Sequence, residues 1–144
     1  MNILFDTSVL VAAIVRIHPM HERAVVWLKR VKMQRDTGIV SAHTLAELYA
    51  ILTRLPIQPR ISPDLARRLI HDNVLTTCQV IPLTQDDYEA VIARMAERGL
   101  VGGVTYDALI LHAAVKAQVD VIVTLNEKDF IRIDPSLANK ITTP

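Results

Sequence analysis

The chain has 144 residues, of which 51% are hydrophobic and 22% are charged, and its formal net charge is +1 at pH 7. This composition predicts a packed globular protein and argues against a disordered chain or a strongly cationic nucleic-acid coat. The single cysteine, Cys78, excludes an intrachain disulfide and a cysteine-rich zinc site. We therefore expect one domain over residues 1–144 in a cytoplasmic setting.

Short β-branched stretches alternate along the chain with longer helical patterns. The strand candidates are residues 2–5, 38–40, 79–81 and 119–124, and the helix candidates lie near residues 8–15, 20–34, 43–54, 63–75, 86–98 and 107–117. Strands that alternate with helices indicate parallel pairing, and these strands lack polar alternation because both sheet faces are covered. The sequence predicts an α/β fold, a three-layer α/β/α sandwich with a central parallel sheet.

The apolar N-terminal stretch MNILFDTSVLVAAIV does not have the features of a targeting segment. No positive charge leads it, and Asp6 interrupts it, which argues against a signal peptide. The uninterrupted run from Val9 to Val15 is far shorter than the roughly 20 residues that a membrane span needs. We therefore expect no association with a membrane.

Acidic side chains follow the predicted strands, at the edge where open parallel sheets bind ligands. Asp6 directly follows the first strand, Glu47 lies in the first turns of the helix after the second strand, and Asp107 opens its own helix. Asp107 also shares a helical face with apolar residues three, four and seven positions later, where an unpaired carboxylate is costly. These residues are Ile110, Leu111 and Ala114.

Each acid also has a purely structural interpretation. Asp6 would cap the following helix, and Glu47 would complete a capping box with Thr44. Asp107 would favour its helix N-terminus through the dipole, a gain of about 0.3–1 kcal/mol. Capping does not require burial, however, so it leaves the acid on the apolar face unexplained.

Taken together, the acids predict a metal site. Neighbouring carboxylates raise one another's pKa values or need a counter-charge. No lysine or arginine is adjacent to Asp6 or Asp107 in the sequence. Oxygen ligands suit Mg²⁺ or Mn²⁺ rather than zinc, and such a cation can hold a phosphodiester and activate water for its hydrolysis.

Four stretches of the sequence resemble the PIN-domain family, specifically the VapC-like toxin ribonucleases of toxin–antitoxin pairs. They are FDTSVLVA at 5–12, SAHTLAELYAIL at 41–52, GGVTYDALILHAA at 102–114 and VIVTLNEKDF at 121–130. The resemblance implies that Asp6, Glu47 and Asp107 bind Mg²⁺ in an endoribonuclease that cuts RNA as the toxin of a type II toxin–antitoxin pair. It also implies a homodimer and a cognate antitoxin that blocks the site.

The family often has a fourth acidic residue after the last core strand, and Asn126 holds that position here. Asn126 would ligate through its carbonyl or orient water, and Asp129 is the alternative, although it also suits a cap of the last short helix. Thr7 and Ser8 would contact phosphate or a metal-bound water, or would satisfy amides at the helix start. Aromatic residues make up only 4% of the chain, which argues against a base-stacking surface.

Two other functions stay open at this point. Asn126 would also suit a PIN-fold binding module whose catalytic site has decayed. A phosphoacceptor signalling domain of the receiver type would explain Asp6, but LFDT has one acid where that class needs a pair, and VIVTLN lacks its lysine. His43 precedes Glu47 by four residues and is more readily a supporting or surface histidine than a ligand, because hard oxygen sites seldom recruit imidazole.

Overall fold

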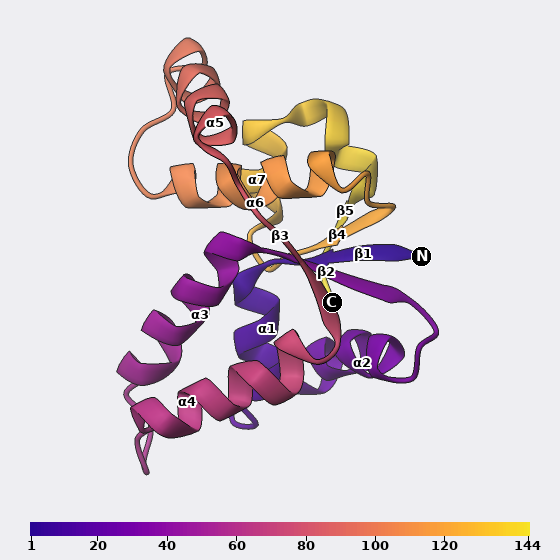
Figure 1. Ribbon diagram of the computed structural model, residues 1–144, viewed down its shortest axis with the longest axis vertical. Coiled ribbons are helices and arrows are strands. Elements are labelled where there is room, and N and C mark those ends of the chain that lie inside the picture. Colours follow the sequence, from indigo (N-terminus) through magenta and orange to yellow (C-terminus); the bar gives the residue numbers. More distant parts are fainter.

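The computed structural model describes residues 1–144 and contains a five-stranded sheet between two layers of helices (Figure 1). The strand order is β3-β2-β1-β4-β5, and every neighbouring pair is parallel. The strands are β1 (Asn2–Phe5), β2 (Thr37–Ser41), β3 (Cys78–Ile81), β4 (Val121–Val123) and β5 (Ile141–Thr142). The helices are α1 (Thr7–Ile14), α2 (His21–Lys32), α3 (Ala42–Arg54), α4 (Pro63–Ile70), α5 (Gln85–Glu97), α6 (Val104–Lys116) and α7 (Glu127–Ile133), with a π-helical turn η1 (His71–Leu75) and a 3₁₀ helix η2 (Pro135–Lys140).

Each face of the sheet has its own hydrophobic core. Ile3 and Phe5 of β1 join a cluster with residues of α1, α2, α3 and α4, whereas Leu4 joins a second cluster with residues of α5, α6 and α7. Figure 1 shows these two groups of helices on opposite sides of the sheet. Both faces of the strands are therefore covered, which confirms the predicted three-layer α/β architecture and explains why the strands read as continuous apolar runs.

The predicted elements are confirmed, and the helices α7 and η2 lie beyond the last predicted helix. Three further differences concern single elements. The strand β5 was not predicted, because two residues are too few to show a periodic pattern. The predicted helix at 63–75 is an α-helix only to Ile70 and continues as the π-helical turn η1. Helix α6 begins at Val104, so Asp107 lies inside its first turn rather than at its start. None of the helices combines the length and the apolar composition that crossing a membrane requires.

Local capping interactions set the ends of α4 and α5. The Ser62 hydroxyl accepts a hydrogen bond from the Leu65 amide at 3.2 Å, directly before Pro63 at the first position of α4. Thr84 and Asp87 form a reciprocal capping box at the start of α5. Gly99 follows the end of α5 with φ of +63°, a left-handed conformation that suits glycine.

The connections between the strands reverse the strand order at β1. The chain runs from β1 to β2 and β3 on one side and then crosses back through α5 and α6 to β4 on the other side of β1. The carboxyl ends of β1 and β4 therefore adjoin, and the Asp6 amide donates to the Val123 carbonyl at 3.0 Å. Open α/β sheets bind ligands at such a reversal of strand order, and Asp6 stands directly at it.

Candidate active site

Asp6 is a buried carboxylate at the carboxyl end of β1. Only 1% of the residue is exposed, and its Oδ2 accepts hydrogen bonds from the hydroxyls of Ser8 and Thr124, the latter at 2.7 Å. Burial raises the pKa of Asp6, and these two hydroxyls partly offset that rise. Asp6 occupies the N-cap position of α1, but its side chain makes no capping hydrogen bond of good geometry to the helix.

The two hydroxyls connect Asp6 to the loop between β4 and α7. The Ser8 hydroxyl accepts from the Leu125 amide at 3.0 Å, and the Thr124 hydroxyl accepts from the Asn126 amide at 2.9 Å. Ser8 thus serves a loop amide, not the amides at the start of α1. Thr124 was not among the predicted site residues, although its place directly after the buried run VIV marks the end of a strand.

Glu47 lies inside α3, one turn beyond its start. The helix begins at Ala42, with Ser41 as the cap whose hydroxyl accepts from the His43 amide at 3.2 Å. The capping box of Thr44 with Glu47 is therefore wrong, because both residues are interior to the helix. Burial raises the pKa of Glu47, the negative charge of Asp6 raises it further, and His43 lowers it.

His43 joins Glu47 to a second aromatic ring. Its Nε2 lies 3.2 Å from the Oε2 of Glu47, although the two atoms are not aligned as a hydrogen bond. The imidazole stacks on Tyr106 with 5.1 Å between ring centroids and 8° between ring planes. His43 therefore contacts both α3 and α6 beside the acids, in the supporting position that the sequence favoured.

Asp107 is a half-buried carboxylate in the first turn of α6. The residues that share its face, Ile110, Leu111 and Ala114, are each at most 1% exposed, so the face is a core face as expected. Burial raises the pKa of Asp107 to about 7, and the negative charges of Asp6, Glu47 and Asp129 act in the same direction. No positive group opposes this rise in pKa.

The fold thus brings Asp6, Glu47 and Asp107 within electrostatic reach of one another from three separate elements. Their side chains do not already form a group of three ligands at metal-binding distances. Two buried atoms beside them, the Oε2 of Glu47 and the Oγ1 of Thr7, make no well-aligned hydrogen bond, although the Thr7 hydroxyl and His43 lie close enough to Glu47 to lower its pKa. Buried polar atoms normally have a partner, and a set of carboxylate and hydroxyl oxygens fits a hard divalent cation with its bound water.

The two candidates for the fourth position differ in their surroundings. Asn126 is an exposed residue that precedes α7, and its side chain makes no capping hydrogen bond. Asp129 lies one turn later, 3.4 Å from Arg132, and its charge raises the pKa of Asp107. Both residues line an open hollow of about 410 Å³ along this loop. Of the two, Asp129 contributes charge to the acidic group.

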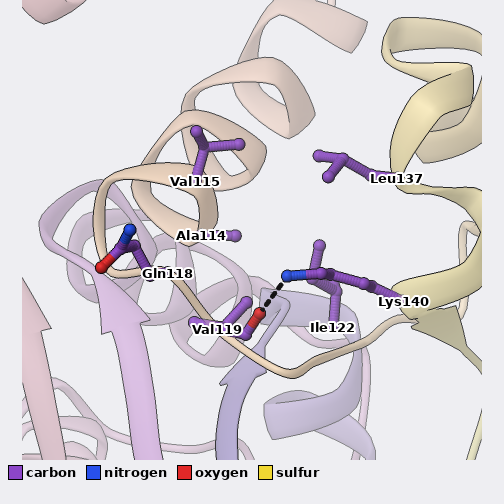
Figure 2. A pocket seen from close by; sticks show the side chains of 7 residues that line it. All are labelled: Ala114, Val115, Gln118, Val119, Ile122, Leu137 and Lys140. Carbon is purple, nitrogen blue, oxygen red and sulfur yellow. Dashed lines mark hydrogen bonds between the residues drawn. The ribbon is translucent and has the colours of Figure 1, made fainter.

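A separate cavity of about 180 Å³ lies at the opposite edge of the sheet (Figure 2). Its lining is mainly apolar and includes Ile122 and Leu137. The one charged group there, the Lys140 ammonium, already donates to the Val119 carbonyl at 2.8 Å. The cavity is lined by no carboxylate, histidine or cysteine, so the acids at the carboxyl edge form the candidate active site.

Comparison with known proteins agrees with this placement. The family model of the PIN domain matches residues 3–135. The chain belongs to the PIN-domain family. It is similar to Ribonuclease VapC40 of Mycobacterium tuberculosis, with 38% identity over 106 residues that cover 73% of this chain and 72% of that protein.

Solved structures of PIN-family relatives share the fold. VapBC2 from Rickettsia felis, bound to a DNA fragment from their promoter, superposes with a TM-score of 0.68 at 20% identity and covers 100% of this chain and 99% of that chain. VapC20 of Mycobacterium tuberculosis, described as a sarcin-ricin loop cleaving toxin, gives a TM-score of 0.65 at 19% identity, over 83% of this chain and 86% of that chain. The phosphoacceptor interpretation of Asp6 has no support in these comparisons.

Proposed function

We propose that this PIN-domain protein is a metal-dependent endoribonuclease that hydrolyses RNA phosphodiester bonds as the toxin of a type II toxin–antitoxin pair. The observation that carries the proposal is the convergence of Asp6, Glu47 and Asp107, whose burial and mutual repulsion raise their pKa values at the reversal of strand order. Perturbed carboxylates gathered at a ligand-binding edge are typical of a catalytic site.

In this proposal Asp6, Glu47 and Asp107 hold Mg²⁺, for which Mn²⁺ can substitute. When bound, the cation supplies charge compensation for a phosphodiester and Lewis acidity for its hydrolysis. No protein nucleophile is involved, so the acids act as ligands and not as covalent catalysts. The relatives' name, ribonuclease, supports RNA as the substrate class.

The residues around the acids hold them in place. Ser8 and Thr124 both donate to the Oδ2 of Asp6, which fixes the orientation of the carboxylate. We assign the fourth acidic position to Asp129, because its charge acts on Asp107. The role of Asn126 as a ligand stays a prediction, as does contact of Thr7 with phosphate or water.

Two protein partners belong to the proposal. The fold neighbour VapBC2 supports a cognate antitoxin that binds this chain and blocks the acids. Exposed apolar side chains on α2 and α3, such as Val26 and Tyr49, support a homodimer. Sedimentation equilibrium of the purified chain should give twice the mass of 16.1 kDa, and a monomer mass would contradict the dimer.

The experiment that tests the function is sequencing of RNA ends after induced expression of the parent chain and of its Asp6→Asn variant. The parent should produce new 5′ ends at defined positions, and the variant should produce none at equal protein level. New ends at the same positions with both proteins would contradict the assignment. Intact RNA with both would favour the alternative of a non-catalytic PIN-fold binding module.

A further inference from the structure

Three of the six phenylalanine, tryptophan and tyrosine side chains are engaged in packing within the protein. Phe5 and Phe130 are fully buried, and the Trp27 ring lies under the Arg30 guanidinium, 5.1 Å from its centroid. The three tyrosines are all exposed on helices: Tyr49 on α3, Tyr88 on α5 and Tyr106 on α6. Tyr106, at 54%, is the most exposed of them and the one that directly precedes an acid of the candidate site.

One face of the Tyr106 ring is covered by His43. The centroid distance of 5.1 Å and the interplanar angle of 8° describe an offset parallel stack between α6 and α3. Because Tyr106 remains 54% exposed with one ring face covered, the opposite face is open to solvent. A contact that only joined α3 to α6 would account for the inner face alone.

The stack leads directly to the acids. The His43 Nε2 lies 3.2 Å from the Oε2 of Glu47, and Tyr106 is adjacent to Asp107 in the chain. A planar group on the outer face of Tyr106 would therefore be the third ring of a stack that ends beside two of the proposed metal ligands. Proteins that recognise single-stranded RNA commonly hold an unpaired base on an aromatic ring in this way.

We propose that the outer face of Tyr106 stacks on an unpaired base of the RNA substrate and so positions the adjacent phosphate at the acids. This inference rests on the proposed ribonuclease function and adds to it a requirement for an unpaired nucleotide next to the cleaved bond. The low aromatic content argues against an extended stacking surface, and a single base platform is compatible with it. Such a platform tolerates any base, since every base presents a flat face.

The test uses the shortest single-stranded RNA that the parent chain cleaves, taken from its mapped cleavage site. Tyr106→Ala should raise KM by about 10-fold with little change in kcat, because stacking contributes to binding. Tyr106→Phe, which keeps the ring, should retain the parent KM. Tyr88→Ala, which removes an exposed tyrosine on α5 away from the acids, is the matched control and should also retain it.

A binding measurement separates stacking from folding effects. The same RNA carries 2-aminopurine at each position beside the cleaved bond in turn, and Asp6→Asn prevents cleavage. Binding of the Asp6→Asn variant should quench the fluorescence at one position. The double variant Asp6→Asn with Tyr106→Ala should not quench it there. Absence of quenching at every position, a parent KM in Tyr106→Ala, or a raised KM in Tyr106→Phe would overturn the platform while the ribonuclease assignment stands. A parent chain that cleaves no RNA would overturn both.

Discussion

Helix α6 contacts two carboxylate environments of opposite character, one at each end. Near its C-terminus, Asp87 of α5 meets the Lys116 ammonium at 2.6 Å and the His112 Nε2 at 3.0 Å. Lys116, the Thr84 amide and His112 hold the pKa of Asp87 far below its usual range. Near its N-terminus, Asp107 faces other acids, and its pKa rises to about 7.

The difference separates an acid with a structural role from the acids that the proposed function requires. Asp87 has fixed donors for both of its oxygens and completes the capping box of α5, so its charge is fully satisfied within the protein. Asp6, Glu47 and Asp107 are held close together with no lysine or arginine among the groups that shift their pKa values. A cation site requires negative charge that the protein itself does not neutralise, and these acids supply it at the ligand-binding edge of the sheet.

The largest expected effect is on catalysis. Asp107→Asn should reduce RNA cleavage by more than about 100-fold. Mutation of a residue that only supports a metal ligand already costs up to about 100-fold, and Asp107 is proposed as a ligand itself. Asp87→Asn should cleave at the parent rate, because Asp87 lies outside the acidic group. Initial rates on the same RNA measure both, and equal losses in the two variants would remove the distinction.

A smaller loss is expected from the hydroxyl that holds Asp6. Thr124→Val keeps the side-chain shape and removes the donor to the Oδ2 of Asp6, so cleavage should fall by roughly 10- to 100-fold. Thr142→Val on β5, whose hydroxyl makes no contact with Asp6, is the control. A parent rate in Thr124→Val would show that the hydroxyl has no positioning role.

Substitution of the two acids should affect thermal stability differently. Asp87→Asn weakens the α5 cap and the contacts of Asp87 with α6, and should lower Tm by roughly 3–6 °C. Asp107→Asn should not lower Tm at pH 8, because it removes a charge that its neighbours repel. Differential scanning calorimetry with EDTA present checks both, and a large fall in Asp107→Asn would contradict the account.

The pH dependence of the free energy of unfolding should separate the acids further. Asp107 has a pKa of about 7 in the folded chain against about 3.9 when unfolded, so the folded state holds a proton that the unfolded state has lost. The free energy of unfolding should therefore fall as pH rises from about 4 to about 7. Asp87 acts in the opposite direction, and its contribution is lost as pH falls below about 4.

Urea denaturation of the parent and of Asp107→Asn at several pH values between 5 and 8, without divalent cations, measures this slope. The parent should lose more stability than the variant across the range. Parallel curves for the two proteins would mean that Asp107 keeps an ordinary pKa.

The sequence was sufficient to predict four of the five strands and to select three acids that the fold brings within electrostatic reach of one another. β-branched runs identified β1 to β4, and the apolar face of α6 made Asp107 conspicuous as an acid among core residues. The strand β5 escaped because its two residues, Ile141 and Thr142, carry no periodicity. Helix starts shifted where a cap was misassigned, as for Ser41 and α3.

Contacts between distant segments were beyond the sequence. The hydrogen bond from Thr124 to Asp6 spans 118 positions, and the stack of Tyr106 on His43 depends on how α6 lies against α3. The place of Thr124 directly after VIV marks the end of a strand, but no local pattern identifies Asp6 as its partner or His43 as the partner of Tyr106. The proposal that Asp129 rather than Asn126 holds the fourth position likewise depends on a contact through space, because the charge of Asp129 raises the pKa of Asp107.

The most direct test of the central claim is equilibrium binding of Mn²⁺, followed by loss of the electron paramagnetic resonance signal of the free ion. The parent chain and Asp87→Asn should bind Mn²⁺ saturably with the same affinity. Asp6→Asn and Asp107→Asn should bind at least about tenfold more weakly. Equal affinity in all four proteins, or no binding by the parent, would contradict a shared cation at Asp6, Glu47 and Asp107.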